Sequence, residues 1–179
     1  MRLDLARRYK RWRHGRGFGI HSPFAYDFIT RTLRERLPYY AYDRFEALAA
    51  SQRLRVSELK RLRLIFRIAV RFNPASAIII GDRNASLQKV ALKSVRRNVN
   101  FAPEPSDADL IIINDDSADI KSTRDKLVYI FPDTNCGGLS TCERIWSETT
   151  RGMRFDNSRG FTIIVHSPTL PRQHFDVRF

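Results

Sequence analysis

The sequence predicts an α/β fold in which a basic helical N-terminal region, residues 1–72, precedes an α/β domain, residues 73–179. Apolar residues recur at helical spacing through the first region. Short apolar runs alternate with amphipathic stretches in the second region, and the chain closes with a hairpin sequence. A chain of 179 residues can bury a sufficient core without disulfides or metal ions.

The N-terminal region is expected to consist of several helices, separated by the glycine-rich residues 14–19 and by Pro38. Apolar residues recur every three positions over residues 3–12 with basic residues between them, which is typical of an amphipathic helix. Ser22 and Pro23 predict the start of a second helix, because Ser is a preferred N-cap and Pro is tolerated at the first helical position. A third helix is expected over residues 39–56, and Ser57 is expected to cap a fourth.

Short continuous apolar runs in the second region indicate strands buried on both faces of a parallel sheet. These runs cover residues 77–80, 110–113 and 127–131. Amphipathic stretches at 85–97 and 139–150 predict helices between and after the strands. Segments 153–155 and 161–165 flank a turn sequence, NSRG, and predict an antiparallel hairpin. Residues 174–179 alternate apolar and polar side chains, as an edge strand would.

The positive charge is concentrated in the N-terminal region. The net charge is +13, and residues 1–71 hold 18 basic and 6 acidic residues. Arginine dominates, and its planar guanidinium suits phosphate and carboxylate. The pattern therefore predicts nucleic acid or another polyanion as partner, with a solvated basic helix face as the equally weighted alternative. The residues assigned to nucleic-acid binding are Arg7, Arg8, Lys10, Arg11 and Arg13.

Several site classes are absent from the sequence. No apolar run approaches the roughly 20 residues of a membrane span. Cys136 and Cys142 form no C-x-x-C pair, so we expect reduced thiols in a cytoplasmic protein and no metal site. The four histidines are scattered and lack a neighbouring nucleophile, so none is assigned a catalytic role. They are His14, His21, His166 and His174.

Two segments resemble a known family. Residues 21–29, HSPFAYDFI, with Pro38-Tyr39-Tyr40 after them, resemble the N-terminal signature of class I S-adenosylmethionine-dependent methyltransferases common in Bacteroidetes bacteria. Residues 173–179, QHFDVRF, are similar to the QHF-x-IRF ending of the same group. The resemblance implies a Rossmann-like fold with a reduced, mostly parallel sheet and a C-terminal antiparallel hairpin. It also implies S-adenosylmethionine as cofactor, bound at the carboxyl ends of the first strands.

The cofactor residues assigned by the resemblance are Gly81 and Asn114, and Asp82 in the same loop is the candidate to substitute for a missing carboxylate; the surrounding pattern departs from the family. Gly81 matches the first glycine of the cofactor loop, whereas the next glycine position holds Ala85. The acidic residue expected two positions before Gly81 is Ile79. Asn114 stands where the family has an aspartate at a strand end.

A second carboxylate that would bind the cofactor's ribose is also lacking. Only Glu104 and Asp107 lie in the corresponding segment, and no strand is predicted before them. The chain is shortened between residues 70 and 109 relative to the family. Asp115, Asp116 and Asp133 should lie at the carboxyl edge of the sheet, where carboxylates could hold a divalent cation. The favoured alternative is that residues 114–117 form a turn that caps the following helix.

The sequence therefore predicts a methyltransferase-like protein with a degenerate cofactor site, weak or absent methyl transfer and a binding or scaffold role. One alternative is an active S-adenosylmethionine-dependent methyltransferase with a rearranged site. Another is a nucleic-acid-binding module that uses the arginine-rich N-terminal helices. Substrate, catalytic residues and oligomeric state are not assigned.

Overall fold

The computed structural model describes residues 19–95, 99–116, 120 and 127–179. The predicted N-terminal amphipathic helix and the basic residues assigned to it (Arg7, Arg8, Lys10, Arg11 and Arg13) lie outside the described residues. The helices are α2 (Pro23–Phe28), the π-helical turn η1 (Ile29–Leu33), α3 (Ala41–Ser51), α4 (Val56–Phe72), α5 (Ala85–Val95), the 3₁₀ turn η2 (Pro105–Asp107) and α6 (Leu139–Glu148). The strands are β1 (Ser76–Ile80), β2 (Asn100–Phe101), β3 (Leu110–Ile113), β4 (Leu127–Phe131), β5 (Gly152–Asp156), β6 (Thr162–His166) and β7 (Gln173–Asp176).

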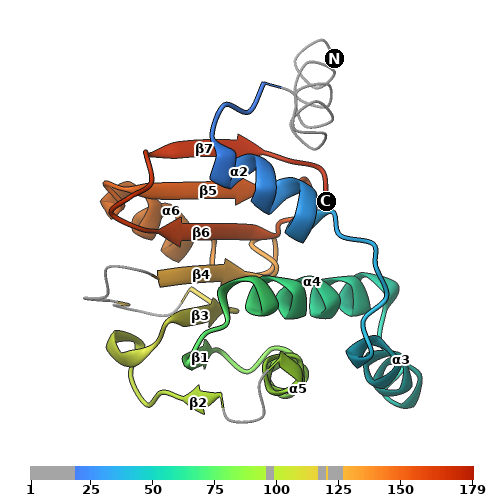
Figure 1. Cartoon of the computed structure of the whole chain (residues 1–179). Helices are drawn as coiled ribbons and strands as arrows, with labels where there is room; N and C mark the ends of the chain where they lie inside the picture. Colours follow the sequence, from blue (N-terminus) through green and yellow to red (C-terminus); the bar gives the residue numbers. More distant parts are fainter. Residues whose placement is uncertain (1–18, 96–98, 117–119, 121–126) are drawn as a thin grey trace, which may run out of the picture.

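The strands form one seven-stranded sheet in the order β2-β1-β3-β4-β6-β5-β7 (Figure 1). The first four strands in this order are parallel. β6 runs antiparallel to both of its neighbours, β4 and β5, and β7 is parallel to β5. The predicted hairpin and the predicted edge strand are therefore both confirmed. This mostly parallel α/β architecture is consistent with a Rossmann-like fold.

The predicted parallel strands coincide closely with the observed ones. β3 and β4 have the bounds of the apolar runs that predicted them, and all nine of their residues are buried. Strands covered on both faces read as continuous apolar runs, which is why the sequence located them well. The sequence missed β2, because its two residues carry neither an apolar run nor an alternating pattern.

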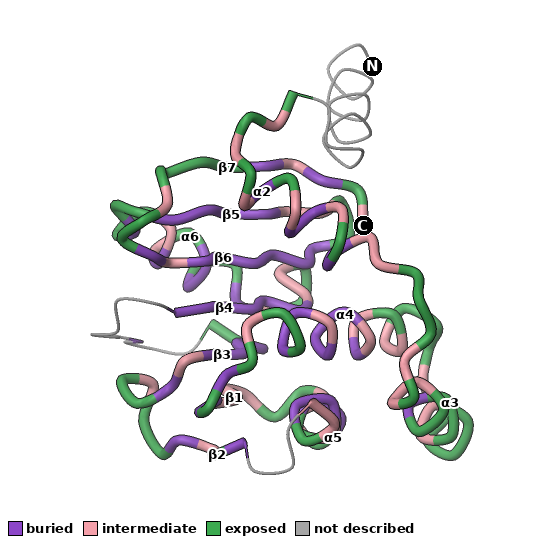
Figure 2. The backbone as a smooth tube through the Cα atoms, in the orientation of Figure 1, coloured by how far each residue is buried: buried purple, intermediate pink, exposed green. Residues whose placement is uncertain are grey.

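One face of the sheet is covered by α2, α4 and α5 (Figure 2). Their buried side chains share a single apolar cluster with residues of the strands beneath them. Phe28 of α2 packs edge-on against Phe155 of β5, with ring centroids 5.0 Å apart. Ile65 and Ile68 of α4 are 1% and 0% exposed in the same cluster. The helical region and the sheet thus have one common core on this face.

The other face of the sheet is covered by α6. Cys142 and Ile145 of this helix join Ile111, Tyr129 and Ile164 of the strands in a second apolar cluster. Burial in this cluster raises the pKa of Cys142 to about 12. Both cysteines are free, as expected, with Cys136 exposed and Cys142 buried.

Two helix boundaries differ from the prediction. The helix expected over residues 39–56 is α3 and ends at Ser51. The next helix begins at Val56 with Arg55 as N-cap, so the prediction that Ser57 is the cap is wrong. The reason is Glu58, whose carboxylate accepts a hydrogen bond from the Arg55 backbone N–H at 2.8 Å. In contrast, Ser22 caps α2 as predicted, its hydroxyl accepting from the Ala25 N–H at 3.3 Å.

Within the described part of the chain, no helix combines the length and the apolar character that crossing a lipid bilayer requires.

Candidate functional site

The carboxyl ends of β1, β3 and β4 meet at one edge of the sheet, because these strands are parallel. Gly81 follows β1, Asn114 follows β3, and Pro132 and Asp133 follow β4. This edge is where an open α/β sheet forms its ligand crevice. It is therefore the place to compare with the predicted cofactor residues.

Asn114 is held inside the protein by Gln88 of α5. The Gln88 amide donates to Asn114 Oδ1 at 2.7 Å, and Asn114 Nδ2 donates back to Gln88 Oε1 at 3.0 Å. Asn114 Nδ2 also lies 3.2 Å from the Ile80 carbonyl oxygen. Asn114 and Gln88 are only 7% and 3% exposed. The amide of Asn114 is thus committed to a buried side-chain pair that ties α5 to the ends of β1 and β3.

The exposed side chain of Asp115 lies directly against Gly81. Gly81 has a φ of +83°, which favours glycine, and a Cβ placed on it would lie 2.6 Å from Asp115 Oδ2 and 3.2 Å from the Asn114 Cβ. The loop after β4 also packs closely against the loop after β3, since a Cβ on Gly137 would lie 2.9 Å from the Asn114 carbonyl oxygen. The loops that follow β1, β3 and β4 therefore pack on one another at this edge.

Asp82 lies in the turn between β1 and α5 and is exposed. Its carbonyl oxygen accepts a hydrogen bond from the Ala85 N–H at 3.2 Å, and Asn84 adopts a left-handed conformation with φ of 56°. This is a tight turn that leads directly into the helix. Of the three predicted cofactor residues, Gly81 and Asn114 lie together at the edge, and Asp82 lies beside them in the turn.

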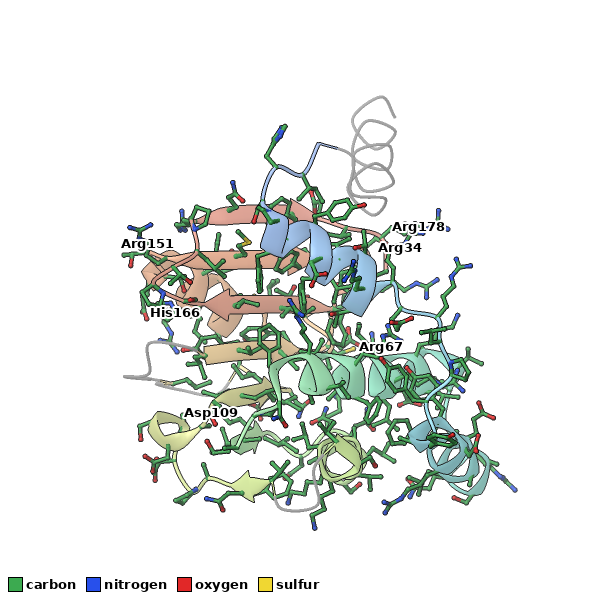
Figure 3. The ribbon with its side chains drawn as sticks, in the orientation of Figure 1. Arg34, Arg67, Asp109, Arg151, His166 and Arg178 are labelled. Carbon is green, nitrogen blue, oxygen red and sulfur yellow. The ribbon has the colours of Figure 1, made fainter. Side chains whose placement is uncertain are left out.

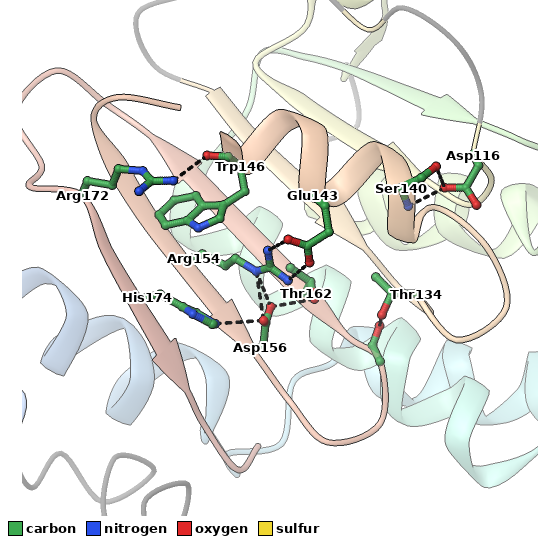
Figure 4. Close-up of polar contacts among 11 residues, drawn as sticks. Asp116, Thr134, Ser140, Glu143, Trp146, Arg154, Asp156, Thr162, Arg172 and His174 are labelled. Carbon is green, nitrogen blue, oxygen red and sulfur yellow. Dashed lines mark hydrogen bonds and ion pairs between the residues drawn. The ribbon is translucent and has the colours of Figure 1, made fainter. Parts of the chain in front are cut away.

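Asp116 and Asp133 serve structural contacts at the same edge. The Asp116 carboxylate accepts hydrogen bonds from the Ser140 hydroxyl at 2.7 Å and from the Ser140 and Thr141 N–H groups, so it caps α6 (Figure 4). The Ser140 hydroxyl is the main cause of the lowered pKa of Asp116; burial opposes it, and backbone N–H donors add to the lowering. Asp133 pairs with Arg61 of α4 at 2.7 Å. Helix capping, the favoured interpretation of this segment, is thus confirmed for Asp116, with α6 as the capped helix.

Glu104 and Asp107 lie at the opposite end of β1 from Gly81. β2 pairs only with the first two residues of β1, Ser76 and Ala77. The Ser76 hydroxyl donates to the Asp107 carbonyl oxygen at 2.7 Å, which places Asp107 beside the start of β1. Both carboxylates do follow a strand, contrary to the prediction. However, β2 ends beside the start of β1, so the residues that follow it do not reach the carboxyl edge of the sheet.

A second polar cluster lies between α6 and strands β5 and β7, and Arg154 is its centre (Figure 4). The two terminal nitrogens of Arg154 donate to the two oxygens of Glu143 at 2.9 and 2.7 Å. Its Nε lies 2.9 Å from Asp156 Oδ2. Asp156 also accepts from the Thr162 hydroxyl at 2.8 Å and contacts His174 Nε2 at 2.9 Å. The guanidinium of Arg154 is thus held on both sides by carboxylates.

Burial and pairing oppose each other in this cluster. Burial disfavours the charges on Arg154 and Asp156, which are 7% exposed and half-buried respectively. Hydrogen bonds from His174 and Arg154 outweigh burial at Asp156 and lower its pKa. Hydrogen bonds to Glu143 and Asp156 likewise raise the pKa of Arg154. Both groups are therefore charged at neutral pH.

The same cluster contains a group of side chains able to ligate a cation. Asp156, His174 and Asp176 each offer one ligand atom, and these atoms lie within 4.8 Å of one another. However, the Asp156 carboxylate already neutralises Arg154, so a cation would compete with the guanidinium. The arrangement therefore favours a structural role, in which a network of ion pairs holds β7 and α6 to β5.

Only part of this cluster is indicated by the sequence pattern. Arg154 and Asp156 are two positions apart on β5, and this spacing indicates that they share a face. Their neighbours on β7 follow from the pairing of Arg154 with His174 and of Asp156 with Asp176. Residues of two strands that are not joined by a hairpin carry no local signal of their register, so this part of the cluster could not be read from the sequence.

Comparison with protein-family models, curated proteins and solved structures finds no match to this chain.

Proposed function

We propose that this chain is a methyltransferase-like α/β protein whose crevice does not hold S-adenosylmethionine tightly, and that it acts by binding or as a scaffold. The observation that carries the proposal is the packing at Gly81. The Asp115 carboxylate lies against this glycine, where the resemblance implies that the cofactor should approach the backbone. At the same edge, the amide of Asn114 is occupied by its buried hydrogen bonds to Gln88.

The resemblance itself supports a weakened site in a methyltransferase-like fold. A parallel sheet that ends in an antiparallel hairpin agrees with the family architecture. The acidic residue expected before Gly81 is Ile79, and Glu104 and Asp107 lie at the far end of β1. The two carboxylates that the resemblance implies for the amine and the ribose of the cofactor are therefore not at their expected positions on this edge.

The expected loss of cofactor affinity can be estimated from the two missing interactions. One charge-assisted hydrogen bond is worth about 1.5–3 kcal/mol, and one unsatisfied buried hydroxyl costs about 1–3 kcal/mol. Together these terms weaken a cofactor site by roughly 10²- to 10⁴-fold. A site of ordinary micromolar affinity would then bind in the millimolar range or not at all.

Calorimetric titration with S-adenosylmethionine and with S-adenosylhomocysteine tests the proposal. We expect no saturable heat below millimolar ligand. Micromolar binding would contradict the proposal and favour the alternative, an active methyltransferase with a rearranged site. In that case Asp82→Lys should abolish binding, because it places a cation beside Gly81, whereas Asp43→Lys on α3 should leave binding unchanged.

Nucleic-acid binding through the N-terminal region is a second proposal, which rests on the net charge of +12 in residues 1–71. If about six phosphates are contacted, affinity should fall by roughly 10³-fold between 50 and 200 mM salt. Deletion of residues 1–16 should abolish this binding. A flat salt response, or full retention after the deletion, would contradict it.

The cysteines favour a reducing compartment. Both thiols are free, and disulfides are characteristic of oxidising compartments. We therefore propose the cytoplasm as the location.

A further inference from the structure

A pocket of about 160 Å³ lies between η1 and α4, in the helical layer that covers one face of the sheet. Three arginines line it, Arg31 from η1 and Arg67 and Arg71 from α4. Asp27 of α2 is the acidic residue of the lining. These four side chains carry a formal charge of +2, and none of them belongs to the loops that follow β1, β3 and β4.

Asp27 is shared between the two outer arginines. Its Oδ1 lies 3.3 Å from the Nε of Arg31, and its Oδ2 lies 2.8 Å from Nη2 of Arg71. The Arg31 and Arg71 side chains are 82% and 42% exposed, so both guanidinium groups stand at the mouth of the pocket. One carboxylate therefore holds two cations side by side and balances only one of them.

Arg67 is the inner arginine, and the partners described for it are uncharged. Its Nε donates to the Thr32 carbonyl oxygen at 2.9 Å, and its Nη2 donates to the Leu33 carbonyl oxygen at 3.0 Å. Its Nη1 lies 3.4 Å from the Tyr42 hydroxyl. Figure 3 shows Arg67 where the end of η1 lies over α4. These neutral groups orient the half-buried guanidinium of Arg67 but do not neutralise its positive charge. An anion in the pocket would do so.

The π-helical turn explains why these carbonyl groups are available. η1 closes with the Arg34 N–H donating to the Ile29 carbonyl oxygen at 3.1 Å, and the carbonyl groups of its last residues lack further helical donors. Arg67 satisfies two of them and is thereby held in one orientation. A guanidinium that is already ordered loses little conformational entropy when it binds an anion. Single π-helical turns recur at functional sites.

Tyr39 adds a neutral donor to the lining. Burial, together with the nearby Glu35, raises the pKa of Tyr39 above its ordinary value, so the hydroxyl stays protonated at neutral pH. A phenol can then donate to an oxyanion without adding charge. The lining thus combines three cations, one anion and the hydroxyl groups of Tyr39 and Thr32.

We propose that this pocket binds a dianionic phosphate group, as carried by a phosphate monoester. A dianion balances the formal charge of +2, whereas a carboxylate or a phosphodiester leaves one positive charge uncompensated. Arg67 uses three of its five N–H groups on the contacts above, and the planar guanidinium groups of Arg31 and Arg71 suit phosphate oxygens.

Calorimetric titration of the full chain at low ionic strength tests the proposal with four probes. Inorganic phosphate and phenyl phosphate are the dianions, and acetate and dimethyl phosphate are the monoanions. We expect saturable binding of both dianions and at least tenfold weaker binding of both monoanions. In ¹⁵N-resolved spectra, phenyl phosphate should shift the Nε–H signal of Arg67.

A pair of matched variants locates the site. Val70 lines the pocket and is 38% exposed, so Val70→Glu adds a negative charge there without touching the contacts of Arg67. Val56 is a 70% exposed valine at the start of the same helix and is absent from the lining, so Val56→Glu makes the same charge change elsewhere. We expect Val70→Glu to weaken phosphate binding by at least tenfold and Val56→Glu by less than twofold. Absence of phosphate binding in the wild type, or equal weakening in both variants, would overturn the proposal.

Discussion

Arg154 shows how strongly a single residue can depend on its partners. Its side chain is 8% exposed and lies between Glu143 and Asp156. Removal of one member of a buried ion pair typically costs about 3–5 kcal/mol, because the partner charge stays buried. We expect Arg154→Met to lower the free energy of unfolding by about 3 kcal/mol, measured by urea denaturation. Arg151→Met, at an exposed position close by in the sequence, should change it by less than about 0.5 kcal/mol. A loss below about 1 kcal/mol for Arg154→Met would contradict this account of the network.

The lowered pKa of Asp156 in the folded protein determines how this residue makes stability depend on pH. Its pKa is lowered in the folded protein, because hydrogen bonds from His174 and Arg154 outweigh the opposing effect of burial. The unfolded chain therefore binds the proton more tightly. The contribution of Asp156 is complete above the ordinary aspartate pKa of about 3.9 and is lost as the pH falls through the lower folded value.

The free energy of unfolding should accordingly fall as the pH is lowered from about 5 to about 3, and Asp156→Asn should flatten this fall. Asp82→Asn, at an exposed position in the turn after β1, should retain the wild-type slope. Urea denaturation at several pH values measures all three proteins. An unchanged slope in Asp156→Asn would show that other carboxylates dominate the acid response.

At the scale of the element, α6 depends on a cap that comes from a distant part of the chain. Gly138, the residue before the helix, provides no side chain, and Asp116 accepts hydrogen bonds from the first turn instead. Loss of such a cap costs about 0.5–2 kcal/mol. We expect Asp116→Ala to reduce stability by this amount and to speed amide hydrogen exchange at Ser140 and Thr141. Asp116→Asn keeps an acceptor and is the matched control. Equal effects of the two substitutions would exclude capping as the cause.

The elements that the sequence located best are those whose local pattern and burial agree. β3 and β4 are buried on both faces, and an apolar run predicts such strands directly. The start of α4 was misplaced because Ser57 is a common N-cap residue, whereas the contact that fixes the boundary is made by Glu58. β2 was missed because two residues are too few to show a period.

At the scale of the whole molecule, the candidate site could be predicted only in part. The sequence placed Gly81 and Asn114 at one edge, since both directly follow apolar runs. It could not show that Gln88 would pair with Asn114, because these residues are 26 positions apart and belong to different elements. The contact between Asp115 and Gly81 is equally non-local. Such contacts between distant residues depend on tertiary packing, so the local sequence pattern does not predict which side chains occupy this edge of the sheet.

Because the helical region and the sheet share one core, we expect that the chain cannot be divided at residue 72 into parts that fold independently. α2 and α4 cover one face of the sheet, and their side chains Phe28 and Ile65 are fully or almost fully buried there. Residues 73–179 alone would expose Ile112, Ile130 and Phe155 of that face. We therefore expect this fragment to lack a cooperative unfolding transition and to bind a hydrophobic dye, while the whole chain unfolds in one transition.

A point substitution separates loss of the shared core from damage caused by truncation. Phe28 is 0% exposed and contacts both Phe72 of α4 and Phe155 of β5, so it joins the helical layer to the sheet. Phe28→Ala should lower the free energy of unfolding by about 3–5 kcal/mol in the whole chain. Phe24→Ala, on the same helix but only partly buried, should cost less. A sharp transition in residues 73–179, with an unfolding free energy close to that of the whole chain, would show that the sheet does not need the helical layer for its stability.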